Sequence, residues 1–459
     1  MITKYRFGHF AGAGKVGSNL TRVLSADGHD ITLIDSKKEA LSAACELYDV
    51  MGLEGNCATL DSLKEAGAAD ADLLIAVTNA DEVNLLCCVT ARRLNPNIHT
   101  IVRIRNAEYT AQILEMRDVF GLSLVVNPEY SAAVEIERLL RYPGFLTRES
   151  FAKGRVELVE FRLNDESPLT GLKLKQISAV LKTRVLICAV QRGSSITLPD
   201  GEFELKADDR IYMTAPAREL GGILRELGVI TRKVKRVILG GGGLISLNLA
   251  QMLDHDGIQV QIIDREQERC EELASQLPHA SICFGDITDI STLDREGLSS
   301  ADAFVALTGM DELNVVMSLY AVSQHVPIVI TKQGHIDELQ DIIGELSLGS
   351  VISPKQLCSD IVVRYVRSMR DSGGDTAITV QTVAGGQVQA CEFVIGPGTP
   401  HKNTPLSELN IRQGVLIPAI FHPGKVTIAG GSSVYAEGDS VIVISSESKN
   451  IQRFSDIFA

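Results

Sequence analysis

The chain has 459 residues, enough for three or four domains of about 100 to 150 residues each. A formal net charge of -14 argues against broad electrostatic attachment to nucleic acid or to an anionic membrane surface. The apolar runs are short compared with the roughly 20 residues that span a bilayer, and the chain opens with no export signal, so we predict a cytoplasmic protein.

The first predicted unit is a strand, the loop GAGKVG at residues 12–17, and a helix over SNLTRVLSADG. This order, with an acidic residue about 20 positions later, is typical of dinucleotide binding. The first glycine makes a tight turn, the second lets the backbone approach a pyrophosphate at the helix N-terminus, and the third lets helix and strand pack closely. A loop that no longer binds a ligand is the alternative. The predicted phosphate-binding residues are Gly12, Ala13, Gly14, Lys15, Val16 and Gly17.

Asp35 ends the next predicted strand, ITLID, and is placed to accept hydrogen bonds from both hydroxyls of an adenosine ribose. A 2'-phosphate would meet this carboxylate as a like charge, so NAD(H) or an adenine nucleotide is favoured over NADP. Lys15 either reaches the terminal phosphates of a triphosphate or is solvated.

Short apolar strands then alternate with amphipathic helices, which predicts a parallel sheet with βαβ connections. Thr78 and Asn79 follow a strand at its carboxyl edge, where they either face the ligand or cap the loop. The polar residues at 81, 82 and 84 either cap the following helix or touch a ligand or ion. Arg103 and Arg105 project from one side of a strand and meet a phosphate, a neighbouring subunit or a surface salt-bridge partner.

The second half of the chain repeats this pattern about 230 residues later. The loop GGGLIS replaces the third glycine by Ser246, so we expect weaker binding there. After the following strands, Asp286 matches Asn56, and Gly334 matches Arg105. The predicted cofactor-binding residues of this half are Gly241, Gly242, Gly243, Leu244, Ile245, Asp264, Thr308, Gly309 and Lys332.

Each such unit is followed by a smaller module with closely spaced strands and a short helix near LKLKQIS or LSELN. The prediction is therefore an α/β protein with two Rossmann-like, doubly wound parallel-sheet domains, each followed by a small α+β module. The predicted domains are 1–145, 146–228, 229–372 and 373–459, and VRSMRDSGGDT (366–376) is predicted to be a flexible linker.

The nine cysteines are an odd number without a CxxC pair, which predicts buried free thiols and not a disulfide framework or zinc ribbon. The nine histidines include no HExxH motif or close pair, so no metal site is predicted. No acid–base constellation for catalysis is found either.

The segments GAGKVGSNLTRVLSADGHDITLID, ADLLIAVTNADEVN, VRIRNAEY and NPEYSAAVEIERLL resemble the TrkA family, the peripheral subunits of bacterial Trk potassium uptake systems. The resemblance covers nearly the whole chain and implies two tandem RCK N-lobe and C-lobe pairs. It implies a non-enzymatic regulator that forms a homo-oligomeric ring on the inner face of the membrane and binds a membrane-embedded potassium transporter. NAD(H), ATP or ADP would change the shape of the ring. An NAD-dependent dehydrogenase, or a soluble nucleotide sensor with a partner that is not a channel, remains the alternative.

Overall fold

The computed structural model describes residues 8–141, 147–152, 154–193, 195–227, 234–334, 349–370, 377–384, 387–446, 451 and 453–459. The chain divides into two compact units, and each unit combines two separate stretches of sequence. One contains Met1–Glu137 and Lys235–Tyr365, and the other contains Arg138–Val234 and Val366–Ala459. The two Rossmann-like lobes, called the first and second N-lobe, therefore belong to one unit, and the two smaller C-lobes belong to the other.

The first N-lobe is built on a six-stranded sheet in the order β3-β2-β1-β4-β5-β6, with all neighbours parallel. This is the strand order of a doubly wound nucleotide-binding fold. The strands are β1 (Gly8–Ala11), β2 (Ile31–Asp35), β3 (Met51–Glu54), β4 (Leu73–Ala76), β5 (His99–Arg103) and β6 (Leu124–Val126). Part of the predicted first strand, YRFGHFA, lies outside the described residues, which begin at Gly8.

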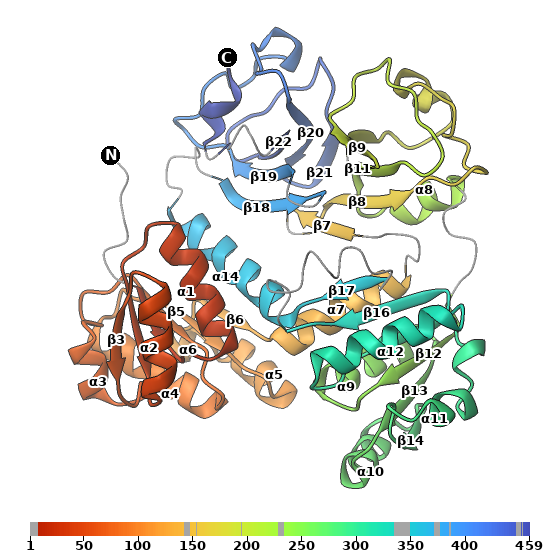
Figure 1. The fold of residues 1–459 in the computed structure, drawn as a ribbon. Helices are drawn as coiled ribbons and strands as arrows, with labels where there is room; N and C mark the ends of the chain where they lie inside the picture. Colours follow the sequence, from red (N-terminus) through yellow and green to blue (C-terminus); the bar gives the residue numbers. More distant parts are fainter. Residues whose placement is uncertain are drawn as a thin grey trace. The chain divides into compact units, whose positions relative to one another are not determined.

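Helices follow these strands in the chain, and all but the last connect one strand of the sheet to the next (Figure 1). They are α1 (Lys15–Ala26), α2 (Lys38–Leu47), α3 (Leu60–Glu65), α4 (Asp81–Leu94), α5 (Ala107–Glu115), α6 (Arg117–Phe120) and α7 (Pro128–Arg141). Strand β4, LLIA, is buried at every position, because helices cover both faces of a parallel sheet. Its Leu74 packs with Ile98, Val102 and the buried face of α4 in the core of the lobe.

The second N-lobe repeats this sheet in the order β14-β13-β12-β15-β16-β17, again with parallel neighbours. Its core lies around Ile238, Ile263 and Phe304. The strands are β12 (Arg236–Gly240), β13 (Gln259–Asp264), β14 (Ser281–Phe284), β15 (Ala303–Ala306), β16 (Ile328–Lys332) and β17 (Ser350–Ile352). The helices are α9 (Leu244–His255), α10 (Gln267–Gln276), α11 (Ile290–Arg295), the 3₁₀ turn η2 (Leu298–Ser300), α12 (Asp311–Ser323) and α14 (Pro354–Arg370).

Helix α14 joins the second N-lobe to the first. The Asn19 side chain of α1 donates a hydrogen bond of 2.8 Å to the Ser359 hydroxyl of α14, and both side chains are buried. Part of the predicted linker is thus wrong, because residues 366–370 continue this helix. Residues 371–376 of that segment lie outside the described residues.

Each C-lobe contains a five-stranded antiparallel sheet, in the order β10-β9-β11-β8-β7 or β18-β19-β22-β20-β21. The first comprises β7 (Thr147–Phe151), β8 (Val156–Arg162), η1 (Leu174–Ala179), β9 (Leu186–Arg192), β10 (Ser195–Thr197), β11 (Arg210–Pro216) and α8 (Leu220–Glu226). The second comprises β18 (Ala377–Val383), β19 (Val388–Val394), η3 (Leu406–Glu408), β20 (Val415–His422), β21 (Lys425–Ile428), β22 (Ser440–Ser446) and η5 (Phe454–Ile457).

The predicted short helices near LKLKQIS and LSELN are the 3₁₀ helices η1 and η3. The two C-lobes share one apolar cluster, in which Phe151, Leu158 and Tyr212 of the first pack with Ala390 and Ile444 of the second. The predicted fold class, two Rossmann-like domains with small α+β modules, is confirmed.

Candidate nucleotide site

Both glycine loops contain the tight turn that the sequence predicts. Gly12 and Gly241 have the same backbone angle, φ of +109°, a conformation that residues with a side chain rarely adopt. A Cβ atom on Gly12 would lie 3.1 Å from the backbone nitrogen of Thr78, and one on Gly241 would lie 3.1 Å from the carbonyl of Leu307. The first glycine of each loop thus allows a close approach to the strand end beside it.

The second glycine of the binding motif caps the helix in each loop, and there is open space beside it. Gly14 is the N-cap residue of α1 and Gly243 is the N-cap residue of α9. No protein atom lies within 4 Å of the place where a Cβ atom would stand on either glycine. The first backbone N–H groups of both helices therefore lie beside a space that a phosphate can enter, and the helix dipole favours a negative charge there.

The third position differs between the loops. A Cβ atom on Gly17 would lie 1.8 Å from the Gly12 carbonyl oxygen, so this position in the first loop requires glycine. In the second loop Ser246 stands there, fully buried, and its hydroxyl donates a hydrogen bond to the Gly241 carbonyl. The serine therefore closes the second loop through its side chain, while the first loop is closed by close backbone packing.

Asp35 and Asp264 hold the two loops in the same way. One carboxylate oxygen of Asp35 accepts from Ala13 N at 2.6 Å and the other from Lys37 N at 2.9 Å. In the second N-lobe, Asp264 accepts from Gly242 N at 2.6 Å and from Glu266 N at 2.9 Å. Because a carboxylate can accept about four hydrogen bonds, each aspartate retains capacity for the hydroxyls of a ribose.

A cavity of about 870 Å³ opens onto both loops. Its wall contains predicted binding residues of both N-lobes, although the sequence predicts a separate site in each lobe. The predicted residues in its wall are Gly14, Val16, Asn79, Arg103, Gly241, Gly242, Gly243, Leu244, Ile245, Asp264, Thr308, Gly309 and Lys332. The wall does not include Gly12, Ala13, Gly17, Asp35 or Thr78, and the side chain of Lys15 is outside the described part of the structure.

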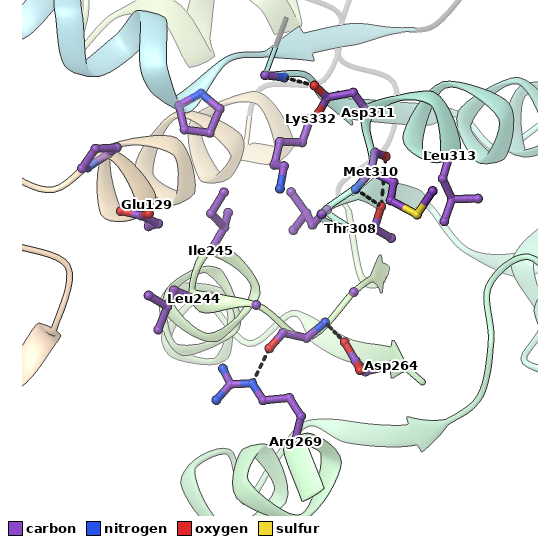
Figure 2. A pocket seen from close by; sticks show the side chains of 18 of the residues that line it. Glu129, Leu244, Ile245, Asp264, Arg269, Thr308, Met310, Asp311, Leu313 and Lys332 are labelled. Carbon is purple, nitrogen blue, oxygen red and sulfur yellow. Dashed lines mark hydrogen bonds between the residues drawn. The ribbon is translucent and has the colours of Figure 1, made fainter. Parts of the chain in front are cut away.

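Figure 2 shows the second loop from within this cavity. Leu244 and Ile245 begin α9, Thr308 and Met310 follow β15, and Lys332 ends β16. All of these positions lie at the carboxyl edge of the parallel sheet, which is where ligands bind in open α/β folds.

Two threonine–asparagine clamps fix the loops at this edge. Thr78 donates to Asn84 Oδ1 from its backbone N at 2.8 Å and from its hydroxyl at 2.7 Å, and Asn84 Nδ2 donates to the Arg103 carbonyl at 3.0 Å. Thr308 and Asn314 form the same clamp. Thr78 therefore takes part in loop capping, one of its two predicted roles.

The acidic residues at the start of α4 and α12 also accept hydrogen bonds from backbone N–H groups. Asp81 accepts from Arg105 N and Asn106 N, both at 2.9 Å, and Asp311 accepts from Gly334 N at 2.9 Å. Ala80 occupies the N-cap position of α4, so the predicted capping of this helix by its polar side chains is not observed. These carboxylates instead tie the helix start to the loop after the next strand.

Arg103 and Arg105 meet at one carboxylate, that of Glu129 at the start of α7. Their guanidinium groups lie 3.3 Å and 3.0 Å from Glu129 Oε1. The side chains of Arg103 and Glu129 are only 11% and 14% exposed, so this ion pair is more buried than the predicted surface salt bridge. Arg103 Nε and Glu129 Oε2 are buried without a hydrogen-bond partner in the described structure.

Several residues of the cavity wall were not predicted. Glu129 belongs to the first N-lobe and Lys355 to the second, and both come directly after the matching prolines that begin α7 and α14. The repeat of these prolines was a usable signal for both positions. Arg269 of α10 donates from Nε to the Gly242 carbonyl at 2.6 Å (Figure 2) and pairs with Glu272, whereas Ala40 stands at the matching place in α2.

Within the described ranges, no cluster of three or more His, Cys, Asp or Glu side chains is arranged to hold a metal ion. In the same residues, no helix combines the length and apolarity needed to cross a membrane.

Comparison with protein families agrees with the duplicated architecture. The TrkA-N domain model matches residues 10–128 and again residues 237–354, and the TrkA-C domain model matches residues 158–228. The TrkA-N matches contain both glycine loops together with Asp35 and Asp264.

Similar proteins match over almost their whole length. The Trk system potassium uptake protein TrkA of Halomonas elongata is 30% identical over 97% of both chains. TrkA homolog 2 of Methanosarcina mazei is 29% identical, over 96% of this chain and 98% of the relative. Among solved structures, the GsuK RCK domain has a TM-score of 0.62 at 18% identity, and covers 97% of this chain and 93% of its own. The GsuK channel bound to NAD has a TM-score of 0.61 at 18% identity, over 98% of this chain and 78% of its own. The shared fold, both family models and the full-length relatives lead to one conclusion: the chain belongs to the TrkA family.

Proposed function

We propose that this chain is the nucleotide-binding regulatory subunit of a Trk-type potassium uptake system, and that it acts on a membrane-embedded transporter subunit. The observation that carries the proposal is the cavity on which both glycine loops open, in a chain that a TrkA relative matches over 97% of its length. Those relatives are named as Trk potassium uptake proteins. In this proposal the subunit is peripheral to the inner face of the membrane and acts as a regulator and not as an enzyme.

The proposed ligands are NAD(H) together with ATP and ADP, adenine nucleotides that compete for the same sites. Their pyrophosphate lies at the N-termini of α1 and α9, and their ribose lies at Asp35 or Asp264. Around these places the cavity wall carries six cationic side chains, Arg103, Arg105, Arg265, Arg269, Lys332 and Lys355, beside five carboxylates, Glu129, Asp264, Glu266, Asp286 and Asp311. In a chain with a formal net charge of -14 this wall is close to charge balance, and its cations can stabilise the negative charges of a di- or triphosphate.

A bound nucleotide controls the transporter only through its differential affinity for two conformations of the assembly. Each tenfold preference for one conformation shifts the equilibrium by about 1.4 kcal/mol. The cavity suits this role because its wall includes both N-lobes, so a ligand that binds there contacts groups from both halves of the duplicated chain.

A homo-oligomeric ring is the proposed form of the assembly. Two exposed apolar residues of the first N-lobe, Leu60 and Leu86, recur 230 positions later as Ile290 and Val316. Each is at least 42% exposed. Matching apolar surfaces on both copies of a repeated lobe are suited to association between copies of the chain.

An NAD-dependent dehydrogenase is the main rival, because the same fold serves hydride transfer. It requires an acid–base group at the nicotinamide end of the site. The described residues at the sheet edge, including Thr78, Thr308 and the aspartates at 81 and 311, are engaged in backbone and loop contacts. Sustained NADH oxidation that depends on a small organic substrate would favour the dehydrogenase.

The decisive experiment is affinity purification of the full chain from detergent-solubilised membranes, with NADH, ATP, ADP or no nucleotide. We expect a polytopic potassium transporter to be retained, and potassium flux in proteoliposomes to depend on the nucleotide. A chain carrying both Asp35→Ala and Asp264→Ala is the matched control, since it should bind the transporter but lose the nucleotide response. Recovery of cytosolic proteins only would support the alternative of a nucleotide sensor without a channel partner.

A further inference from the structure

The two N-lobes differ at the place where the base of a bound nucleotide would lie. In this fold the ribose binds at the carboxylate that ends the second strand, so the base attached to that ribose lies close to the same strand end. In the second N-lobe that neighbour is β14, next to β13. Gly285 N donates to the Asp264 carbonyl at 2.9 Å, so the turn after β14 lies against the end of β13. Residues 285–287 of this turn line the cavity beside Asp264.

Asp286 is the polar side chain of this turn. Its Oδ1 accepts a hydrogen bond from Thr288 N at 2.9 Å, which fixes the turn, and a carboxylate has capacity for about four hydrogen bonds in all. Hydrogen bonds from the backbone and hydroxyl of Thr288 lower the pKa of Asp286, and the nearby charge of Arg265 acts in the same direction. The group is therefore an ionised carboxylate at neutral pH, and an ionised carboxylate accepts hydrogen bonds but donates none.

The first N-lobe builds the same turn from a different side chain. Asn56 stands 230 positions before Asp286, and its Oδ1 accepts from Ala58 N at 3.0 Å. The position matching Arg265 is Ser36. The backbone turn is thus the same in both halves. Its side chain differs: the carboxylate of Asp286 only accepts hydrogen bonds, whereas the amide of Asn56 both donates and accepts them.

We propose that Asp286 makes the second site selective for a purine with an amino group at position 6, whereas Asn56 leaves the first site tolerant of a 6-oxo purine. The amino group of adenine donates to a carboxylate. The 6-oxo group of hypoxanthine would place one acceptor against another, and a site built to receive a donor rejects an analogue that lacks it. The amide of Asn56 instead offers a donor to the oxo group. This inference rests on the proposed binding of adenine nucleotides in both N-lobes.

The test is isothermal titration of the full chain with ATP and with ITP, which differ at position 6 of the base. The variants Asp286→Asn and Asn56→Asp exchange the two side chains. Both are expected to fold, because the present structure contains the same turn with either residue. Asp35→Ala and Asp264→Ala, each added separately, assign the measured affinities to the two sites.

We expect the second site to prefer ATP over ITP about tenfold more strongly than the first site does, which corresponds to one additional hydrogen bond to a charged group. Asp286→Asn should reduce this preference to that of the first site, and Asn56→Asp should raise the preference of the first site. An ITP-to-ATP affinity ratio that neither exchange alters would overturn the inference while leaving nucleotide binding intact. Absence of ATP binding to the unaltered chain would instead overturn the proposed function.

Discussion

Arg103 and Glu129 form an ion pair of 3.3 Å in the wall of the cavity on which both glycine loops open. Arg105 binds the same carboxylate oxygen at 3.0 Å. The carboxylate of Glu129 thus occupies the guanidinium groups that would otherwise be available to a phosphate. Buried pairs of this kind are costly to break from one side, because the remaining charge loses its partner.

Replacing Glu129 by Gln should therefore strengthen the binding of polyphosphates. We expect the affinity for ATP to rise about three- to tenfold relative to AMP, since the freed arginines gain an anionic partner. Isothermal titration of both nucleotides would measure the ratio. Lys355→Gln, at the matching position of the second half, is the control and should lower the same ratio. If Glu129→Gln weakens ATP, the carboxylate supports the ligand, and its competition with phosphate is ruled out.

The two ribose-site aspartates should set the preference for NADH over NADPH. Hydrogen bonds to a charged group contribute about 1.5 to 3 kcal/mol, so Asp264→Ala should weaken NADH at its own site roughly ten- to a hundredfold. Asp264→Asn removes the charge but retains an acceptor for Gly242 N, and should mainly narrow the difference between NADH and NADPH. Calorimetry on both variants, and on the Asp35 counterparts, separates recognition of the ribose from support of the loop. Equal affinities in wild type and alanine variants would exclude the predicted role.

The third position of each glycine loop gives a matched pair of stability predictions. Gly17→Ser would place a Cβ atom 1.8 Å from the Gly12 carbonyl oxygen, so the loop must shift. We expect a loss of about 1 to 3 kcal/mol and a lower unfolding temperature. Ser246→Gly removes only the hydrogen bond to the Gly241 carbonyl, at a cost of about 0.5 to 1.5 kcal/mol. A larger effect of Ser246→Gly than of Gly17→Ser would contradict this reading of the two loops.

In the first C-lobe, the ionised carboxylate of Asp209 should stabilise the fold at neutral pH and lose this effect in acid. Its side chain is 1% exposed. Burial alone would raise the pKa of Asp209, but hydrogen bonds from Arg192 and from Lys206 N outweigh burial and lower the pKa. Because the folded pKa is depressed, the stabilisation is present above the unfolded pKa and is lost as the pH falls through the folded value, below about pH 4.

Removing the Arg192 guanidinium should shift the acid-induced loss of stability to higher pH. Arg192→Met leaves a buried carboxylate without its ion pair, and we expect about 1 to 3 kcal/mol of destabilisation at pH 7, a range that allows for the 42% exposure of Arg192. Thermal unfolding between pH 3 and pH 7 would follow both effects. Arg162→Met is the control, since its pair with Asp208 is exposed and should contribute little. An unchanged acid profile in Arg192→Met would show that this ion pair does not control the titration of Asp209.

The sequence predicted those features that depend on local spacing. The glycine turns, the aspartates 23 residues after them and the alternation of strand and helix follow from short-range rules, and the structure has them in both halves. The contacts of Asn84 with the Arg103 carbonyl and of Asp81 with Arg105 N could not be derived in this way, because these groups are 19 and 24 residues apart in the chain and meet only at the sheet edge.

The cavity shared by the two N-lobes also could not be predicted from the sequence. Periodicity within each half gives one glycine loop for each sheet, but it contains no information on which lobes pack together. The buried hydrogen bond between Asn19 and Ser359 joins positions 340 residues apart, and no local pattern predicts it. Glu129 therefore had no visible connection to the second loop until the lobes were seen in one unit.

The covalent duplication has a consequence for evolution. If the two N-lobes were separate copies of one gene product, every substitution would appear in both. A glutamate at the start of α7 would then be present twice in the cavity wall. In the fused chain Glu129 lies in the same wall as Lys355, its counterpart in the repeat. Fusion has thus released the halves from symmetry, so that selection can tune one loop, one base pocket or one counter-charge while leaving its twin unchanged.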